Sequence, residues 1–223
     1  MTLKYEVVRS ARKSIQITVE RDRKVVVRAP KQASENSVLA AVESKRYWIW
    51  QKLRDPHKYP DPAPRKEYVT GETFLFLGQH YGLTLTHDAS GEVKLCGKNF
   101  QMAVSDRTSG DTLFRNWYLA EARRRMGPRI ASLATEMGVD FSRIWVRDLR
   151  YRWGSCTPRG TLSFNWRIIQ APMIVVDYLI VHELAHVLEP NHSQDFWNIV
   201  AVHVPSWQKA RNWLKLHGAQ LEW

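Results

Sequence analysis

One segment, residues 173–188, constrains the fold of this chain more than any other. The helix that its length and pattern predict is apolar nearly all round, so it belongs in a protein interior. Pro172 suits its first turn, and Glu189-Pro190-Asn191 ends it. Inside this apolar helix stands the sequence His182-Glu183-Leu184-Ala185-His186. A buried helix with two histidines and a glutamate leaves dipoles or charge unpaired unless something, such as a divalent cation, satisfies them.

The spacing of these residues gives them different roles. His182 and His186 are four residues apart, so one helical turn brings both imidazoles to the same face, where they can hold one ion. Glu183 projects about 100° away from His182. It cannot easily join the histidines, but it can reach a water molecule at an open position of the ion, as a general base must. The HExxH pattern therefore predicts a hydrolytic metal centre with Glu183 as its catalytic residue.

A catalytic zinc centre needs a third protein ligand. His192 lies six residues beyond His186, just after a break that can turn the chain back toward the ion. We therefore predict that His192 completes the set of metal ligands. Four other side chains compete for this position, and they are Glu189, Asp195, His203 and Cys156. Cys156 would serve as a thiolate, as in a deformylase-like site.

The segments before this helix predict an α+β fold. Alternating apolar and polar residues predict a hairpin over residues 14–28, and Ser34 then caps a helix that runs to about residue 54. Prolines in residues 55–64 predict an extended connector. Four more strands are expected at 72–77, 81–86, 92–95 and 100–104.

The apolar period becomes helical from residue 111. It predicts a long helix to residue 137, which Gly127-Pro128 must kink or split. Three strands are then expected at 143–147, 151–156 and 161–166. Ser193 caps the next helix, and a last helix ends at His217-Gly218. The change of pattern predicts an N-terminal basic β-rich lobe with one helix, residues 1–104, and a second lobe, residues 105–223, which carries the HExxH motif and is the catalytic lobe.

Composition limits the class of protein. With 44% apolar and 25% charged residues, the chain is neither disordered nor fibrous. No apolar run reaches the roughly 18–20 residues of a membrane-spanning helix, and the N-terminus has no signal-peptide pattern. Two cysteines, Cys96 and Cys156, are too few for a disulfide framework. We therefore expect a soluble cytoplasmic protein without a structural disulfide.

The net charge points to a class of partner. It is +11, with a pI of about 9.8, so polyanions and acidic protein surfaces attract the chain. Residues 1–104 carry 18 Lys or Arg against 11 Asp or Glu, and residues 105–223 carry 15 against 11. A nucleic acid is therefore a candidate partner of the basic N-terminal lobe. The densest basic run, Arg123-Arg124-Arg125, is typical of a solvated helix face.

Further motifs surround the HExxH segment. They are Arg152-Trp153-Gly154-Ser155-Cys156, Leu162-Ser163-Phe164-Asn165-Trp166, Pro190-Asn191-His192-Ser193 and Phe196-Trp197. Together with HExxH, these motifs resemble the YgjP-like metallopeptidases, and the resemblance extends across nearly the whole chain. It implies a zincin catalytic lobe similar to those of the SprT-like and WLM-type proteases, with zinc held by His182, His186 and His192. The spacing also equals the metzincin pattern HExxHxxGxxH, but Glu189 replaces its glycine.

These features predict a zinc-dependent metallopeptidase that hydrolyses peptide bonds in a protein or peptide, with Glu183 as general base. In zincins an edge strand aligns the substrate, and the resemblance gives this place to the hairpin at 151–166. Asn165 and Asp177 can orient a ligand histidine or serve plain turn and surface roles. Two alternative functions stay open, namely a nucleic-acid-associated protein with a basic N-terminal lobe and a zinc amidase or deformylase for small substrates.

Overall fold

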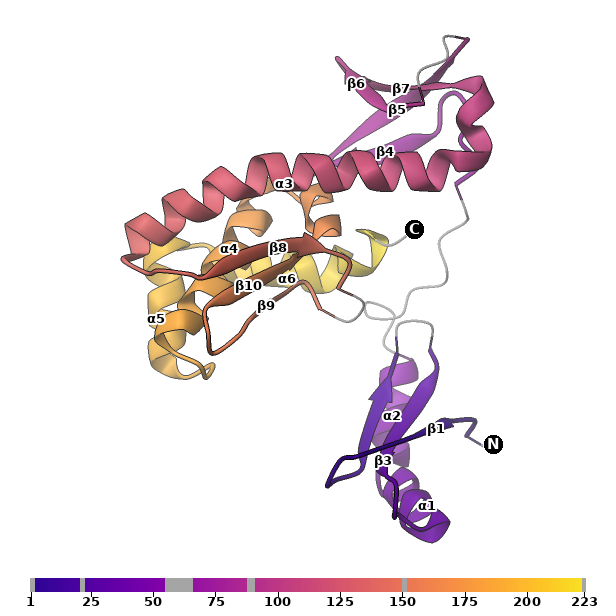
Figure 1. The fold of residues 1–223 in the computed structure, drawn as a ribbon, viewed down its shortest axis with the longest axis vertical. Coiled ribbons are helices and arrows are strands. Elements are labelled where there is room, and N and C mark those ends of the chain that lie inside the picture. The colour runs from indigo at the N-terminus through magenta and orange to yellow at the C-terminus, as the bar shows by residue number, and fades with distance from the viewer. Residues whose placement is uncertain (1–2, 21–22, 55–65, 88–90, 150–151, 222–223) are drawn as a thin grey trace. The chain divides into compact units, whose positions relative to one another are not determined.

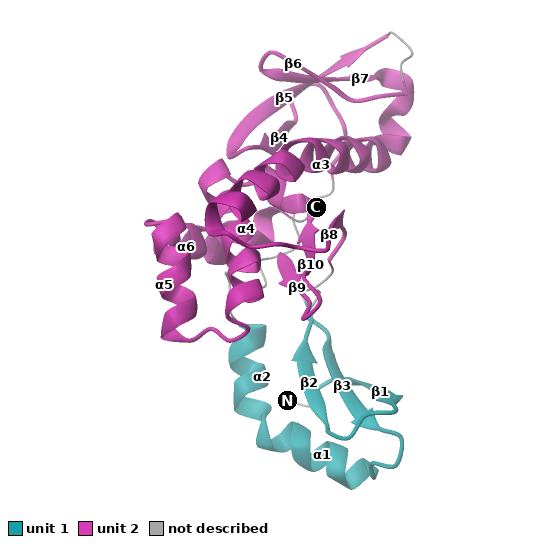
Figure 2. Cartoon of the chain, turned by 60° about the vertical axis from the view of Figure 1, so that its left-hand side comes forward, with its two compact units in different colours: residues 1–62 teal, residues 63–223 magenta. Residues whose placement is uncertain are grey.

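The computed structural model describes residues 3–20, 23–54, 66–87, 91–149 and 152–221 (Figure 1). The connector predicted at residues 55–64 lies outside these ranges. The chain forms two compact units, residues 1–62 and 63–223 (Figure 2), and each is described by itself. Within the described ranges, no helix combines the length and hydropathy needed to span a bilayer.

Unit 1, residues 1–62, is a three-stranded sheet with two helices. Its elements are β1 (Glu6–Ser10), β2 (Gln16–Val19), β3 (Val25–Pro30), α1 (Glu35–Ser44) and α2 (Arg46–Leu53). β3 lies in the centre, parallel to β1 and antiparallel to β2, which confirms the predicted hairpin. Valines of β2, β3 and α1 pack with Ile49 of α2 in a core of their own.

The single helix predicted after Ser34 is in fact two helices. Ser34 caps α1 as expected, because its hydroxyl accepts a hydrogen bond from the Ser37 amide at 3.2 Å. Lys45 separates the helices, with φ −106° and ψ 7°, and its amide donates to the Val42 carbonyl at 3.1 Å. This hydrogen bond joins residues three apart, as in a 3-10 helix. It tightens the last turn of α1 and redirects the chain into α2.

In its described residues, unit 2, residues 63–223, contains two sheets and four α-helices. The strands of its first sheet are β4 (Thr73–Phe76), β5 (Gln79–Thr86), β6 (Lys94–Cys96) and β7 (Asn99–Ala103), in the order β4-β5-β7-β6. Those of the second are β8 (Arg143–Arg147), β9 (Gly154–Cys156) and β10 (Thr161–Asn165), in the order β8-β10-β9. The helices are α3 (Gly110–Met137), α4 (Met173–Leu188), α5 (Gln194–His203) and α6 (Trp207–His217). Short 3-10 helices are η1 (Val104–Ser109), η2 (Trp166–Gln170) and η3 (Gly218–Leu221).

The predicted break at Gly127-Pro128 does not split α3, which runs as one helix of 28 residues (Figure 1). Proline removes one backbone hydrogen bond and costs about 3 kcal/mol inside a helix. A single buried stripe continues on both sides of Pro128, at Phe114, Tyr118, Ala122, Met126, Ile130 and Leu133. Burial of this stripe offsets the lost hydrogen bond, since each large apolar side chain contributes about 1.5–3 kcal/mol.

One core joins the four-stranded sheet to the helices of unit 2. The rings of Phe74 and Phe114 stack at 3.9 Å between centroids, and the Tyr118 hydroxyl donates to the Leu75 carbonyl at 2.7 Å. The structure therefore divides the chain near residue 62, whereas the change of apolar period predicts a division near residue 104. The apolar period changes where the four-stranded sheet gives way to α3. The two belong to one core, because the sheet packs on this helix.

The turn between β4 and β5 docks on the segment that leads into α4. The amides of Leu77 and Gly78 donate to the carbonyls of Ile169 and Gln170 at 3.0 and 2.8 Å. Gly78 has φ +79°, and a Cβ there would lie 2.7 Å from Cγ of Pro172. Only glycine fits a backbone that is both left-handed and this close to a neighbouring ring.

Candidate metal centre

Helix α4 carries the HExxH motif in the interior of unit 2. Most of its side chains are buried, as its apolar sequence predicts. The helix ends at Glu189, whose amide donates to the Ala185 carbonyl at 2.8 Å. Ser193 then caps α5, because its hydroxyl accepts from the Phe196 amide at 3.3 Å. The turn between these two ends brings His192 back toward α4.

Three imidazoles converge at this turn. One ring nitrogen each of His182, His186 and His192 lies within 4.8 Å of the others. The Nε2 atoms of His182 and His192 are 3.1 Å apart, and the ring centroids of His186 and His192 are 4.7 Å apart. Among the described residues this is the group of His, Cys, Asp or Glu side chains that can hold a metal ion. The structure thus brings together the three residues that the sequence predicts as ligands.

The chemical state of the imidazoles suits a cation. Burial, followed by His186 and His192, lowers the pKa of His182 to about 3, and burial also lowers the pKa of His192. Both rings are therefore neutral near pH 7, as ligation requires. Nδ1 of His186 lies 3.2 Å from the Glu189 carbonyl, so a proton on Nδ1 leaves Nε2 free to bind. Nδ1 of His182 is buried without a partner among the described residues. Three imidazole nitrogens fit zinc.

Glu183 lies beside this cluster in an apolar environment. Its side chain is 4% exposed, and burial raises its pKa to about 8, against the opposing charge of Arg152. The carboxylate faces β9, where a Cβ on Gly154 would lie 2.7 Å from both Cγ and Cδ of Glu183. Gly154 therefore leaves the space that the Glu183 carboxylate fills.

Aromatic rings of α5 line the imidazole cluster. The Phe196 ring centroid is 4.9, 4.6 and 4.7 Å from those of His182, His186 and His192. Trp197 stacks on the His192 ring at 5.7 Å. These rings cover part of the cluster, while the exposed His192 leaves it open to water on one side.

Two further polar side chains face the cluster from α4 and α6. The Tyr178 ring lies 5.8 Å from that of His182, and burial raises the pKa of Tyr178 to about 12. The Arg211 guanidinium lies 5.0 Å from the Trp197 ring centroid. Its charge helps to lower the pKa of His182 and His192 and partly opposes the rise in the pKa of Tyr178. Tyr178 therefore keeps its proton near pH 7 and can donate a hydrogen bond.

The competing ligands stand apart from the cluster. The Glu189 carboxylate accepts from the Asn191 amide at 3.0 Å, and His203 lies 3.3 Å from Glu136. The Cys156 thiol donates to the Thr157 carbonyl at 3.4 Å, and burial raises its pKa, which disfavours a thiolate. None of these, nor Asp195, belongs to the group that can hold a metal within the described part of the chain.

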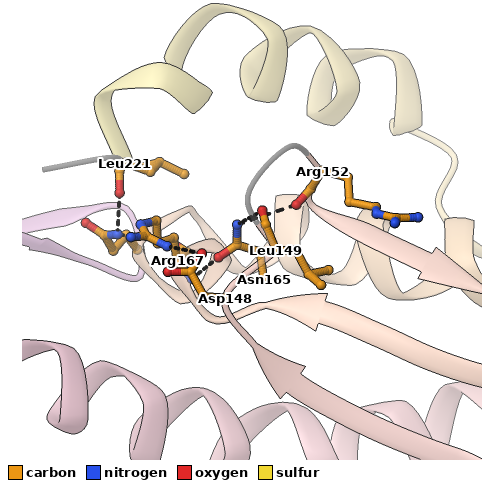
Figure 3. Close-up of polar contacts among 7 residues, drawn as sticks. Asp148, Leu149, Arg152, Asn165, Arg167 and Leu221 are labelled. Atoms are coloured by element: carbon orange, nitrogen blue, oxygen red, sulfur yellow. Dashed lines mark hydrogen bonds and ion pairs between the residues drawn. The ribbon is translucent and has the colours of Figure 1, made fainter. Parts of the chain in front are cut away.

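Asn165 and Asp177 do not orient a histidine. The Asn165 amide donates to the carbonyls of Leu149 and Arg152 at 3.0 and 3.4 Å, as Figure 3 shows. Asp177 instead forms a bidentate ion pair with Arg129 of α3, at 2.7 and 2.8 Å. Asn165 therefore fixes the backbone of Arg152, whose charge acts on Glu183.

Sequence reasoning missed Tyr178, Arg211 and the contact between Gly154 and Glu183. The spacing of Tyr178, four residues before His182, gives a signal, because it places both on one helix face. No pattern near Arg211 links α6 to the histidines, and the role of Gly154 depends on the placement of β9 against α4.

Comparison with known proteins assigns the chain to a family. The family model described as YgjP-like, metallopeptidase domain, matches residues 13–217. The chain belongs to the YgjP-like metallopeptidase family. This match confirms the resemblance seen in the sequence, and with it a zincin-like α+β fold. At the level of the family, the protein is a metal-dependent peptidase.

Two other comparisons, with curated proteins and with solved structures, add little information about function. No curated protein matches the chain. The YgjP-like chain is similar to a crystal structure of the metallopeptidase zymogen abylysin from Pyrococcus abyssi, with 20% sequence identity and a TM-score of 0.31. This likeness covers 46% of the present chain and 94% of the abylysin chain.

Proposed function

We propose that this YgjP-like protein is a zinc metallopeptidase in which His182, His186 and His192 hold the ion and Glu183 is the general base. One observation carries the proposal, namely three converging imidazoles beside a buried carboxylate. A zinc ion with three neutral ligands keeps its full charge and supplies a Lewis acid and a water of lowered pKa.

The environment of Glu183 suits proton transfer. Without a cation its pKa is raised to about 8, and a positive charge nearby lowers the pKa of a carboxyl group. Together these effects bring the pKa toward neutrality, where a carboxylate can accept a proton from water and return it to the leaving amine. Gly154 and Arg152 assist by leaving room for the carboxylate and by favouring its charged form.

The placement of β9 supports an extended peptide as substrate. Within the described sheet, β9 pairs only with β10, so its other edge can accept a further strand. The same strand lies against α4 at Glu183. A peptide added to this edge would pass close to the imidazole cluster, with Tyr178 as a hydrogen-bond donor for the carbonyl oxygen that becomes charged.

A deformylase with a cysteine ligand finds less support. Cys156 stands outside the imidazole cluster, and its raised pKa keeps the thiol protonated. Both cysteines are free, as is common in a reducing compartment. We propose the cytoplasm as the place of action.

Metal analysis and a peptide-library cleavage assay test the proposal. Purified wild-type protein should hold about one zinc per chain. His186→Ala should lose the metal, because it removes a ligand, whereas Glu183→Gln should retain zinc and lose about 10²–10⁴-fold in rate. His203→Ala is a matched control, since this histidine of α5 pairs with Glu136 outside the cluster, and it should keep both metal and activity.

Four outcomes would contradict the proposal. Wild-type protein that binds no metal when zinc is supplied would rule out the metal centre. Glu183→Gln that cleaves peptides at the wild-type rate would rule out Glu183 as the general base. Hydrolysis of small formamides without any peptide cleavage would replace the peptidase by an amidase. Loss of zinc in Cys156→Ser with retention in His192→Ala would assign the third ligand to the thiol.

A further inference from the structure

The positive charge of the chain is concentrated in unit 1. Residues 1–62 contain 14 Lys or Arg against 7 Asp or Glu, a net charge of +7 out of +11 for the whole chain. The imidazole cluster lies in unit 2, so the peptidase chemistry gives no reason for this excess. A basic domain of this kind attracts polyanions.

Helix α2 exposes aromatic side chains on unit 1. Tyr47 is 70% exposed, Trp50 48% and Trp48 38%, while Ile49 between them is fully buried in the core. The rings of Tyr47 and Trp50 stack at 6.0 Å with an angle of 17° between their planes. Ile49 fixes the helix on the sheet, and the three rings border its outer surface. Such a group of exposed rings is typical of a binding surface.

Cations accompany these rings. The segment 45–54 contains four basic residues and no acidic residue. The Arg54 guanidinium lies 4.3 Å from the Trp50 ring centroid, and the Lys52 amine lies 6.0 Å from that of Trp48. Each indole therefore has a positive charge beside it, so a ligand that stacks on the ring can also contact the neighbouring cation.

A hollow adjoins the same helix. Its volume is about 340 Å³, and Ile15, Ile17 and Trp48 form its apolar walls, with Lys45 at its border. It is large enough for a flat aromatic group and carries a cation for an attached anion. Helical spacing places Trp48, Lys45 and this hollow on one flank of α2, and Tyr47, Trp50 and Arg54 on the opposite flank.

We propose that the face of α2 formed by Tyr47, Trp50 and Arg54 is a binding surface for single-stranded nucleic acid, with bases stacked on the two rings and a phosphate beside Arg54. The combination selects this partner, because an unpaired base offers a ring face and each nucleotide brings a negative charge. A duplex hides its base faces, and an acidic polypeptide needs the cations but not the rings.

Fluorescence anisotropy of full-length protein with a labelled oligodeoxythymidylate tests the proposal. Trp50→Ala and Tyr47→Ala should each weaken binding about 5- to 150-fold, the equivalent of 1–3 kcal/mol per stacked base. Trp50→Phe should restore most of the affinity, because a ring remains. Binding should weaken steeply with salt and be much weaker for a matched duplex.

Trp145→Ala is the matched control. Trp145 lies on β8 of unit 2 with 45% exposure, and the Arg143 guanidinium lies 5.5 Å from its ring centroid, so it repeats the chemistry of Trp50 elsewhere. This variant should bind like wild type. The proposal is overturned if Trp145→Ala and Trp50→Ala lose affinity equally, if Trp50→Ala binds like wild type, or if polyglutamate or anionic vesicles displace the probe as well as unlabelled oligonucleotide does. Circular dichroism of each variant verifies that unit 1 remains folded.

Discussion

Helices α4 and α2 depart from the usual distribution of side chains in opposite directions. α4 buries ionisable groups that water would solvate, namely His182 and Glu183, whereas α2 exposes indole rings that a core would accept. Either departure costs free energy, because buried charge and exposed apolar surface are both unfavourable. The comparison indicates that each unusual placement marks a binding site. The buried ionisable groups of α4 suit a cation, and the exposed rings of α2 suit stacked bases.

A substitution outside α4, Gly154→Ala, tests the α4 side of this comparison and has the largest effect among the three predictions that follow. The added Cβ would lie 2.7 Å from Cγ and Cδ of Glu183, so the carboxylate must move. We expect kcat/KM for a cleaved peptide to fall about 10²-fold or more, with zinc content unchanged, because the histidines are not touched.

Gly127→Ala provides the control for this substitution. A Cβ on Gly127 of α3 meets no atom within 4 Å, so this variant should keep full activity. Loss of zinc in Gly154→Ala would show that the strand supports the ligands themselves, and it would contradict a separate role for Glu183.

The second expected effect is on the pH dependence of stability in chelator-treated protein. The raised pKa of Glu183, about 8 against 4.5, contributes stability that is present below pH 4.5 and lost as pH rises through 8. The lowered pKa of His182, about 3 against 6.5, contributes stability that is present above pH 6.5 and lost as pH falls through 3.

Thermal denaturation of Glu183→Gln separates these two contributions. Since glutamine does not ionise, the loss of Tm between pH 4.5 and 8 should shrink relative to wild type, while the loss below pH 6.5 should persist. Identical profiles for wild type and Glu183→Gln would show that the folded protein does not retain the Glu183 proton.

The smallest effect is expected on the α2 side. Trp50→Ala should change the free energy of unfolding by no more than about 0.5 kcal/mol, because the ring is largely exposed. Ile49→Ala, one position earlier, should cost about 2–5 kcal/mol. Urea denaturation measures both values. A large loss in Trp50→Ala would give that ring a structural role and remove the contrast with α4.

The sequence predicted much of the metal centre, because its parts are local. One helical turn fixes His182 and His186, and the turn that follows α4 returns His192, six residues after His186, to them. Tyr178 was within reach of the same reasoning. Gly154 was not, since its role depends on β9 lying against α4, a contact between segments about 30 residues apart in sequence.

The fold shows the same limit. The spacing of apolar residues and the helix caps predicted most strands and helices. The division of the chain near residue 62 instead depends on how the β4–β7 sheet packs on α3. Local rules overstated the break at Pro128, since they omit the burial of Met126 and Ile130 on either side of it.

Gly78 lies far along the chain from the histidines, yet it abuts the ring of Pro172, where α4 begins. A helix transmits displacement along its axis because its turns are hydrogen-bonded to one another. A bulkier residue at position 78 would therefore displace the N-terminal end of α4, and His182 and His186 lie toward the other end of this helix. Selection on ligand geometry can thus act through the β4–β5 hairpin, which contributes none of the three imidazoles.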